Sequence, residues 1–107
     1  MPAAEPTDGC RLEAAGEGRY LLRGDLGFPT VAAMLRNGER EFAGRQRVEV
    51  DLSQLTDADS AGLALLIEWT RAARAAGQDI VFRGMPARLE AIARISGVAD
   101  MLPRVAD

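Results

Sequence analysis

The sequence predicts a single α/β domain with a mixed β-sheet, built in the order β-β-α-β-α-β-α with the helices packed on the sheet. The length of 107 residues suits one domain with one hydrophobic core. Hydrophobic residues make up 48% of the chain and charged residues 27%, which is typical of a globular protein. Segments with strand-like alternation are interleaved with segments of helical apolar spacing, as in α/β proteins.

A β-hairpin is expected first. Residues 10–14 alternate apolar and polar side chains, residues 15–18 have the composition of a turn, and residues 19–23 form a second strand. Gly24 and Gly27 are expected to end it. We place a flexible lead-in before the hairpin, over residues 1–9, because that stretch carries two prolines and little to bury, and we place the domain at 10–107.

A helix follows that opens at Pro29 and stops near Gly44. Its apolar side chains fall on one face at helical spacing: Val31, Met34, Leu35 and Phe42. The β-branched, alternating residues 48–52 predict the next strand, and residues 53–58 a polar connector at the sheet edge.

The second half reads helix, strand, helix. Residues 60–76 predict a helix capped by Asp59 or Ser60, since a short oxygen-bearing side chain accepts hydrogen bonds from free first-turn amides. Residues 79–83 predict a strand and residues 87–96 a helix. The strand-helix-strand passage favours a right-handed crossover and a parallel strand pair, so the leading hairpin makes the sheet mixed.

Smaller features complete the expected fold. Glu90 and Arg94 form an i,i+4 pair on the outside of the last helix. The tail from residue 98 is short, and residues 101–103 are expected to dock back on the domain.

Several function classes are excluded or disfavoured by what the chain lacks. It has no histidine, no lysine and one cysteine, Cys10, so a Ser-His-Asp triad, a Schiff base and a Cys-rich zinc site are excluded. Asp51, Asp57 and Asp59 lack the closing glutamate of a calcium loop, so we expect no metal and no cofactor. The net charge of −3 without a basic tail argues against nucleic acid as a partner.

No membrane insertion is expected, because the longest apolar run, residues 61–67, is far shorter than the ~20 residues of a bilayer crossing. The N-terminal residues lack the features of a secretory signal, and with one unpaired cysteine we expect a cytoplasmic location.

The predicted helix over residues 60–76 is apolar on two sides. One stripe must pack on the sheet, and Leu65 and Trp69 belong to the other. Two interpretations remain open for this second stripe. Either the tail or a neighbouring helix covers it, or it is a protein-binding face, since exposed apolar patches and tryptophan are typical of interfaces.

The start of this helix carries the motif D-S-A-G-L, from Asp59 to Leu63. A helix N-terminus offers unpaired amides and a partial positive charge, the Ser60 hydroxyl can hydrogen-bond a partner, and Gly62 leaves room for another chain. The alternative is an ordinary N-cap with a glycine for tight helix packing.

The strand ending D-L-S at residues 51–53, followed by D-S-A-G-L, resembles the signature of STAS domains, the modules of sulfate transporters and anti-sigma-factor antagonists. Residues 24–26, G-D-L, look like the turn of that family, and the resemblance covers about residues 10–103. Antagonists carry D-S-S-G with the phosphorylated serine second and tend to have an acidic residue after the turn. This chain has Ala61 and Gly27 at those places, which disfavours a phospho-switch, although Ser60 is a possible substitute acceptor.

Residues 59–66, D-S-A-G-L-A-L-L, are most similar to the MlaB-type STAS subunits of Mla phospholipid-transport ABC systems, with Ser60 in the place of their functional threonine. The resemblance implies a non-enzymatic subunit that binds a cytoplasmic ATPase, and through it a permease, on the inner face of the inner membrane. The alternative partner is an anti-sigma kinase. The expected partner-binding residues are Asp59, Ser60, Ala61, Gly62, Leu65 and Trp69.

Overall fold

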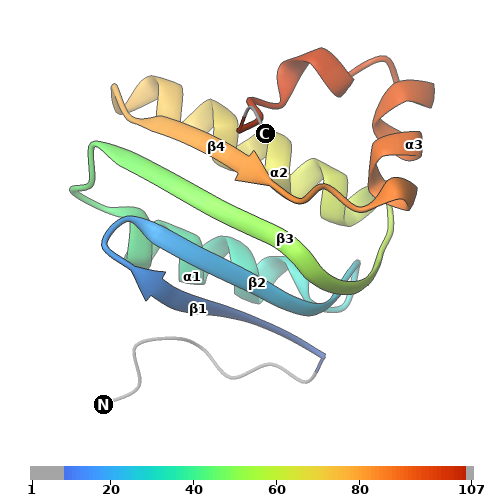
Figure 1. Ribbon diagram of the computed structural model, residues 1–107, viewed down its shortest axis with the longest axis horizontal. Coiled ribbons are helices and arrows are strands. Elements are labelled where there is room, and N and C mark those ends of the chain that lie inside the picture. The colour runs from blue at the N-terminus through green and yellow to red at the C-terminus, as the bar shows by residue number, and fades with distance from the viewer. Residues whose placement is uncertain (1–8, 106–107) are drawn as a thin grey trace.

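Four strands form one mixed sheet whose spatial order follows the chain (Figure 1). The computed structural model describes residues 9–105. Strands β1 (Cys10–Gly16) and β2 (Arg19–Leu26) are antiparallel, whereas β3 (Arg47–Ala58) lies parallel to β2 and β4 (Asp79–Arg83) lies parallel to β3. The hairpin, the parallel pair across the strand-helix-strand passage and the mixed sheet are therefore confirmed.

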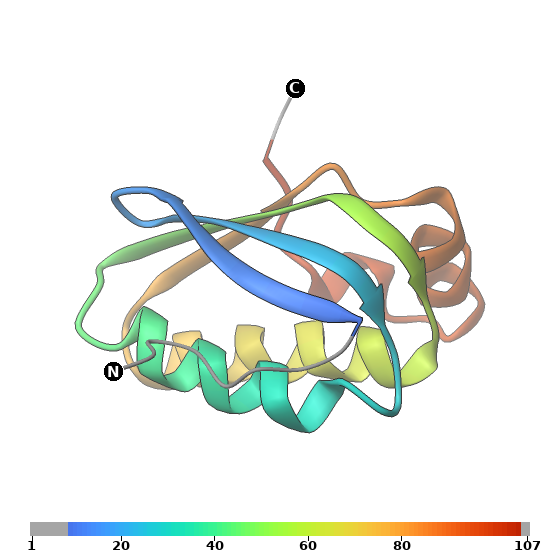
Figure 2. The ribbon, with the colours of Figure 1, turned by 90° about the horizontal axis from the view of Figure 1, so that it is seen from below.

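Two long helices cover one face of this sheet. Figure 2 shows α1 (Val31–Phe42) and α2 (Ser60–Ala75) side by side below the strands. Helix α3 (Ala87–Ile95) packs against α2, and the short 3₁₀ helix η1 (Ala99–Met101) follows it. The element order is the one that the sequence predicts.

The core lies between the sheet and the two long helices, and it is aliphatic apart from Phe82 of β4 and the aromatic residues at one end. There three aromatic rings meet edge to face: Tyr20 and Phe42 with centroids 5.0 Å apart, and Phe42 and Trp69 with centroids 5.1 Å apart. Such edge-to-face pairs stabilise a core beyond the area that they bury. They join β2, α1 and α2 at the end where the helices finish.

Strand β1 continues two residues into the expected turn, to Gly16, and two further strand ends are wrong for a single reason. Strand β2 runs on through Gly24 to Leu26, and β3 runs on through residues 53–58, which we expected to be a connector. The two extensions pair with each other up to Leu26 and Ala58, with register shifts along the way. Residues 53–58 are mostly polar and bury little, so their composition does not predict a strand. They are a strand because their backbone pairs with the backbone of β2.

The tail docks on the domain as expected. Leu102 is buried, and the carbonyl of Pro103 accepts a hydrogen bond of 2.9 Å from the backbone N–H of Phe82. At the other end, the carbonyl of Gly9 accepts from the N–H of Asp25. The rest of the expected lead-in, residues 1–8, lies outside the described residues. Among residues 9–105, no helix has the length and apolar character needed to cross a membrane.

Candidate functional site

Asp59 caps α2 and organises the site around it. Its backbone is extended, and its Oδ1 accepts hydrogen bonds from the backbone N–H of Ala61 (2.9 Å) and of Gly62 (3.1 Å). These are two of the donors that a helix start leaves unpaired. Of the two expected caps, Asp59 is therefore the one that caps the helix, and the Ser60 side chain takes no part in capping.

The other oxygen of Asp59 reaches a different element. Oδ2 accepts a hydrogen bond of 3.2 Å from the backbone N–H of Phe28, in the loop between β2 and α1. Gly27 allows this approach, because a Cβ at that position would lie 2.8 Å from Oδ2. Desolvation pushes the pKa of Asp59 upward, but the N–H groups of Gly62, Phe28 and Ala61 outweigh it and hold the pKa below its ordinary value. One ionised carboxylate thus ties the starts of α1 and α2 together.

The three residues after the cap differ in accessibility. Ser60 is exposed, Ala61 is half-buried and Gly62 is buried. The expected role of Gly62, to admit another chain, is wrong, because its own fold fills that space: a Cβ there would lie 2.7 Å from the Leu26 carbonyl oxygen. Gly62 lets α2 approach the end of β2, and this leaves Ser60 and Ala61 as the accessible part of the motif.

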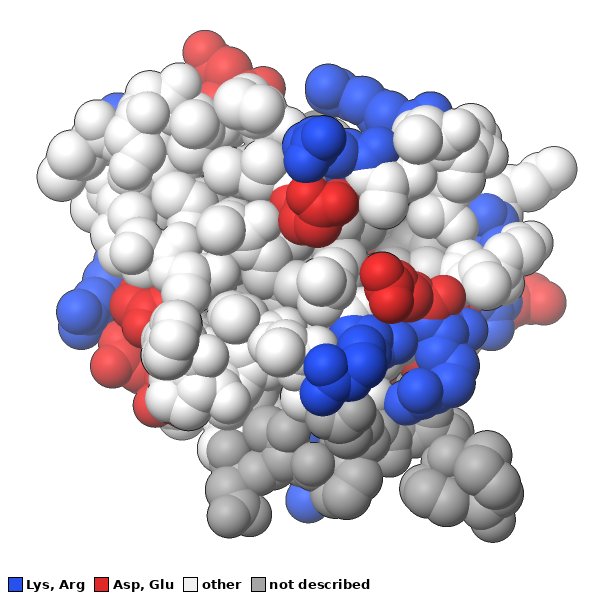
Figure 3. Space-filling view, turned by 180° about the vertical axis from the view of Figure 1, so that it is seen from behind, with Lys and Arg blue, Asp and Glu red and all other residues white. Residues whose placement is uncertain are grey.

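An apolar groove of about 320 Å³ begins beside Ala61, between α1 and α2. Small and aliphatic side chains line it, with Leu65 among them and Glu68 at one end: Val31, Ala32, Leu35, Ala61, Ala64, Leu65 and Glu68. Figure 3 views the molecule from the helix side and shows an uncharged area on its left, where both helices begin. The groove thus begins at Ala61, the residue that follows the exposed Ser60.

Two predicted contact residues are not exposed. Leu65 is 4% exposed and Trp69 is 3% exposed, because α1 covers the second apolar stripe of α2. The interpretation that a neighbouring helix covers this stripe is confirmed. Leu65 still reaches the groove, but the exposed tryptophan surface that we expected is absent.

Phe28 is an exposed apolar residue at the site that we did not expect from the sequence. Its side chain is 80% exposed, beside the loop amide that Asp59 holds. The sequence does carry a sign of this exposure, because Phe28 stands between Gly27 and Pro29. Neither residue favours continuation of the preceding strand, so Phe28 falls in a loop. Its exposure adds apolar area at the start of α1.

This arrangement is suited to binding a protein. It offers a hydroxyl, a fixed carboxylate and an apolar groove. Across the described part of the chain, no group of three or more His, Cys, Asp or Glu side chains is arranged to hold a metal ion. A groove with a polar rim is the usual form of a helix-binding or loop-binding surface.

Comparisons with known proteins agree with this architecture. A family model described as "Mlab, STAS domain" matches residues 10–103. No curated protein matches the chain significantly.

Solved structures share the fold at low identity. The unphosphorylated anti-sigma factor antagonist SpoIIAA is 16% identical with a TM-score of 0.68, over 92% of this chain and 89% of that chain. A protein of Thermotoga maritima described as a candidate anti-sigma factor antagonist is 12% identical with a TM-score of 0.74, over 92% and 86%. RsbS of Moorella thermoacetica is 14% identical with a TM-score of 0.60, over 92% and 86%.

Proposed function

We propose that this chain, which belongs to the STAS domain family in its MlaB-type branch, is a non-enzymatic subunit of a phospholipid-transport ABC complex. In this proposal it binds the cytoplasmic ATPase of the complex, stabilises or regulates it, and through it associates with the permease. It lies on the inner face of the inner membrane without inserting. STAS domains are protein-interaction modules, and the ATPase is the specific partner that we propose.

The observation that carries the proposal is the exposed Ser60 hydroxyl beside an apolar groove. Ser60 occupies the position that resembles the functional threonine of MlaB-type subunits, and it does not serve as the helix cap. A hydroxyl that the fold does not use remains available to a partner. Ala61, the next residue in the helix, lines the apolar groove, which suits a contact that excludes water.

Replacing Ser60 by arginine tests the proposal. Because Ser60 is exposed and Asp59 supplies the cap, Ser60→Arg should change the free energy of unfolding by no more than about 0.5 kcal/mol. A charge forced into an interface without a partner costs several kcal/mol, so co-purification with the ATPase should be lost. The matched control is Ser96→Arg, the same change at an exposed serine that ends α3.

Two results would contradict the proposal. One is a Ser60→Arg variant that melts like the wild type and still co-purifies with the ATPase. The other is loss of the ATPase to an equal degree in Ser60→Arg and Ser96→Arg, which would show an effect of charge rather than of this site.

A second candidate function is an anti-sigma-factor antagonist that binds a serine kinase. The exposed Ser60 hydroxyl favours it, since a kinase needs an accessible acceptor. Ala61, at the place of the antagonists' phosphorylated serine, disfavours it. Incubation with an anti-sigma kinase and ATP, followed by intact mass measurement, separates the two candidates: we expect no added phosphate, and stoichiometric phosphorylation of Ser60 would favour the antagonist.

A further inference from the structure

The outer edge of the sheet, at β4, is occupied by the chain's own tail. Arg104 forms a parallel bridge with Phe82. The N–H of Phe82 donates to the Pro103 carbonyl at 2.9 Å, and the N–H of Val105 donates to the Phe82 carbonyl at 3.0 Å. The tail thus takes up both backbone groups of Phe82 through a single β-bridge and covers this part of the edge, as natural proteins do to protect sheet edges.

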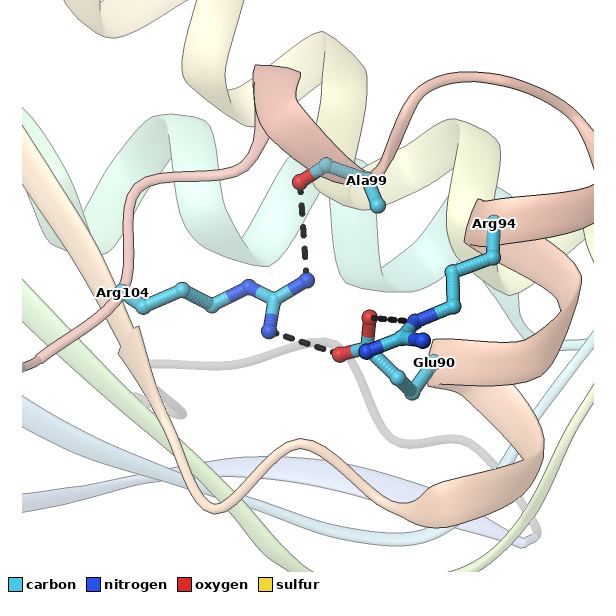
Figure 4. Close-up of polar contacts among 4 residues, drawn as sticks. All are labelled: Glu90, Arg94, Ala99 and Arg104. Atoms are coloured by element: carbon cyan, nitrogen blue, oxygen red, sulfur yellow. Dashed lines mark hydrogen bonds and ion pairs between the residues drawn. The ribbon is translucent and has the colours of Figure 1, made fainter.

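An ion-pair cluster fastens this tail to α3 (Figure 4). Nη1 of Arg104 donates to Oε1 of Glu90 at 2.6 Å, and Nη2 reaches the Ala99 carbonyl at 3.5 Å. Arg94 donates to the other Glu90 oxygen at 3.2 Å. Glu90 and Arg94 both lie on α3, whereas Arg104 lies on the tail. Breaking the Arg104–Glu90 ion pair would therefore release the tail and leave α3 unchanged.

Strand β4 has a sequence suited to pairing with β4 of a second copy of the chain. Alternate residues of a strand point their backbone groups to the same edge, so Ile80 shares the outer edge with Phe82. In a two-fold antiparallel pair centred on Val81, Ile80 of each copy exchanges both hydrogen bonds with Phe82 of the other. The same register sets Asp79 opposite Arg83, an opposite-charge pair at each end.

We propose that the outer edge of β4 is a pairing site for β4 of a second copy of this chain, which residues 103–105 keep closed in the monomer. Such pairing joins two four-stranded sheets into one continuous sheet about a two-fold axis. Its specificity comes from the D-I-V-F-R sequence of β4, which is complementary to itself when reversed. This site lies apart from Ser60 and does not depend on the ATPase proposal.

A chain that ends at Leu102 tests the proposal directly, because it removes the residues that bridge to Phe82 and keeps the buried Leu102. We expect native far-ultraviolet circular dichroism, and in sedimentation a mass that shifts toward the dimer with concentration more than the full chain does. Adding Asp79→Arg to the shortened chain sets like charges opposite Arg83 and should weaken association about fivefold. A shortened chain that is folded and associates no more than the full chain, or a dimer indifferent to Asp79→Arg, overturns the proposal.

Hydrogen exchange on the full-length chain gives a second measurement, which tests whether residues 103–105 close the edge even if the shortened chain does not fold. Arg104→Ala should speed exchange of the Phe82 and Val105 amides about two- to fivefold, the effect of one partly exposed ion pair. Arg94→Ala is the matched control, because it also removes a cation from Glu90 but leaves the tail intact, and it should change those amides little. Equal effects of the two variants, or no effect of Arg104→Ala, would show that this ion pair does not hold the edge closed and would overturn the proposal.

Discussion

The indole of Trp69 lies directly against the backbone of α1 at Gly38. A Cβ at Gly38 would stand 2.5 Å from Nε1 and 2.7 Å from Cε2 of the ring. Both residues are buried, and within residues 9–105 the Nε1 atom has no hydrogen-bond acceptor. The absence of one side chain on α1 therefore sets how closely the two long helices approach.

Gly38→Ala should lower the free energy of unfolding by about 1–3 kcal/mol, because overpacking a tight contact displaces the ring or the helix. This sign is opposite to helix propensity, by which alanine gains about 1 kcal/mol over glycine. Urea denaturation measures the difference. In a Trp69→Leu background the ring is absent, so the same change should become neutral or stabilising. A stabilised Gly38→Ala single variant would contradict the contact.

Asp59→Ala should destabilise the fold by about 1–2 kcal/mol at neutral pH, since it removes a cap and the bond to Phe28. The pKa of Asp59 is lowered in the folded state, so this stabilisation is present above the unfolded value of about 3.9 and is lost as the pH falls through the lower folded value. Urea denaturation of both chains at pH 7 and pH 3 checks this: the difference should shrink at pH 3. An unchanged difference would mean that the carboxylate charge contributes nothing.

Phe28→Ala should leave stability within about 0.5 kcal/mol, because the side chain is 80% exposed. It should weaken binding of the partner roughly tenfold, the loss typical of an apolar interface residue worth about 1.4 kcal/mol. Ile95→Ala is the control, since Ile95 is 87% exposed but ends α3 away from the groove. Titration calorimetry with the ATPase compares them, and equal losses would remove Phe28 from the site.

Cys10 should react with a thiol reagent only when the chain opens. Burial, and next the nearby charge of Asp25, raise the pKa of this thiol to about 11. At pH 8 roughly one part in a thousand is thiolate, and the side chain is 3% exposed. Labelling by a chromogenic disulfide should therefore be slow in buffer and fast in urea. Rapid labelling of the native protein would show that β1 opens readily.

The sequence by itself determined the element order and the parallel pair, and it narrowed the helix cap to Asp59 or Ser60. Each rests on a local signal: alternation, helical spacing, or an oxygen-bearing residue before a helix. The D-S-A-G-L motif likewise marked the exposed Ser60. Local signals suffice here because a residue's own neighbours in the chain decide them.

Only the tertiary structure decided which apolar residues stay exposed. Spacing placed Trp69 on a second apolar stripe, but the lack of a Cβ at Gly38, some thirty residues earlier, lets α1 cover it. Phe28 stays in solvent although it is apolar, and residues 53–58 become a strand because β2 lies beside them. Burial and pairing depend on segments far apart in the chain, and the hydrophobicity of one segment does not reveal which other segment will cover it.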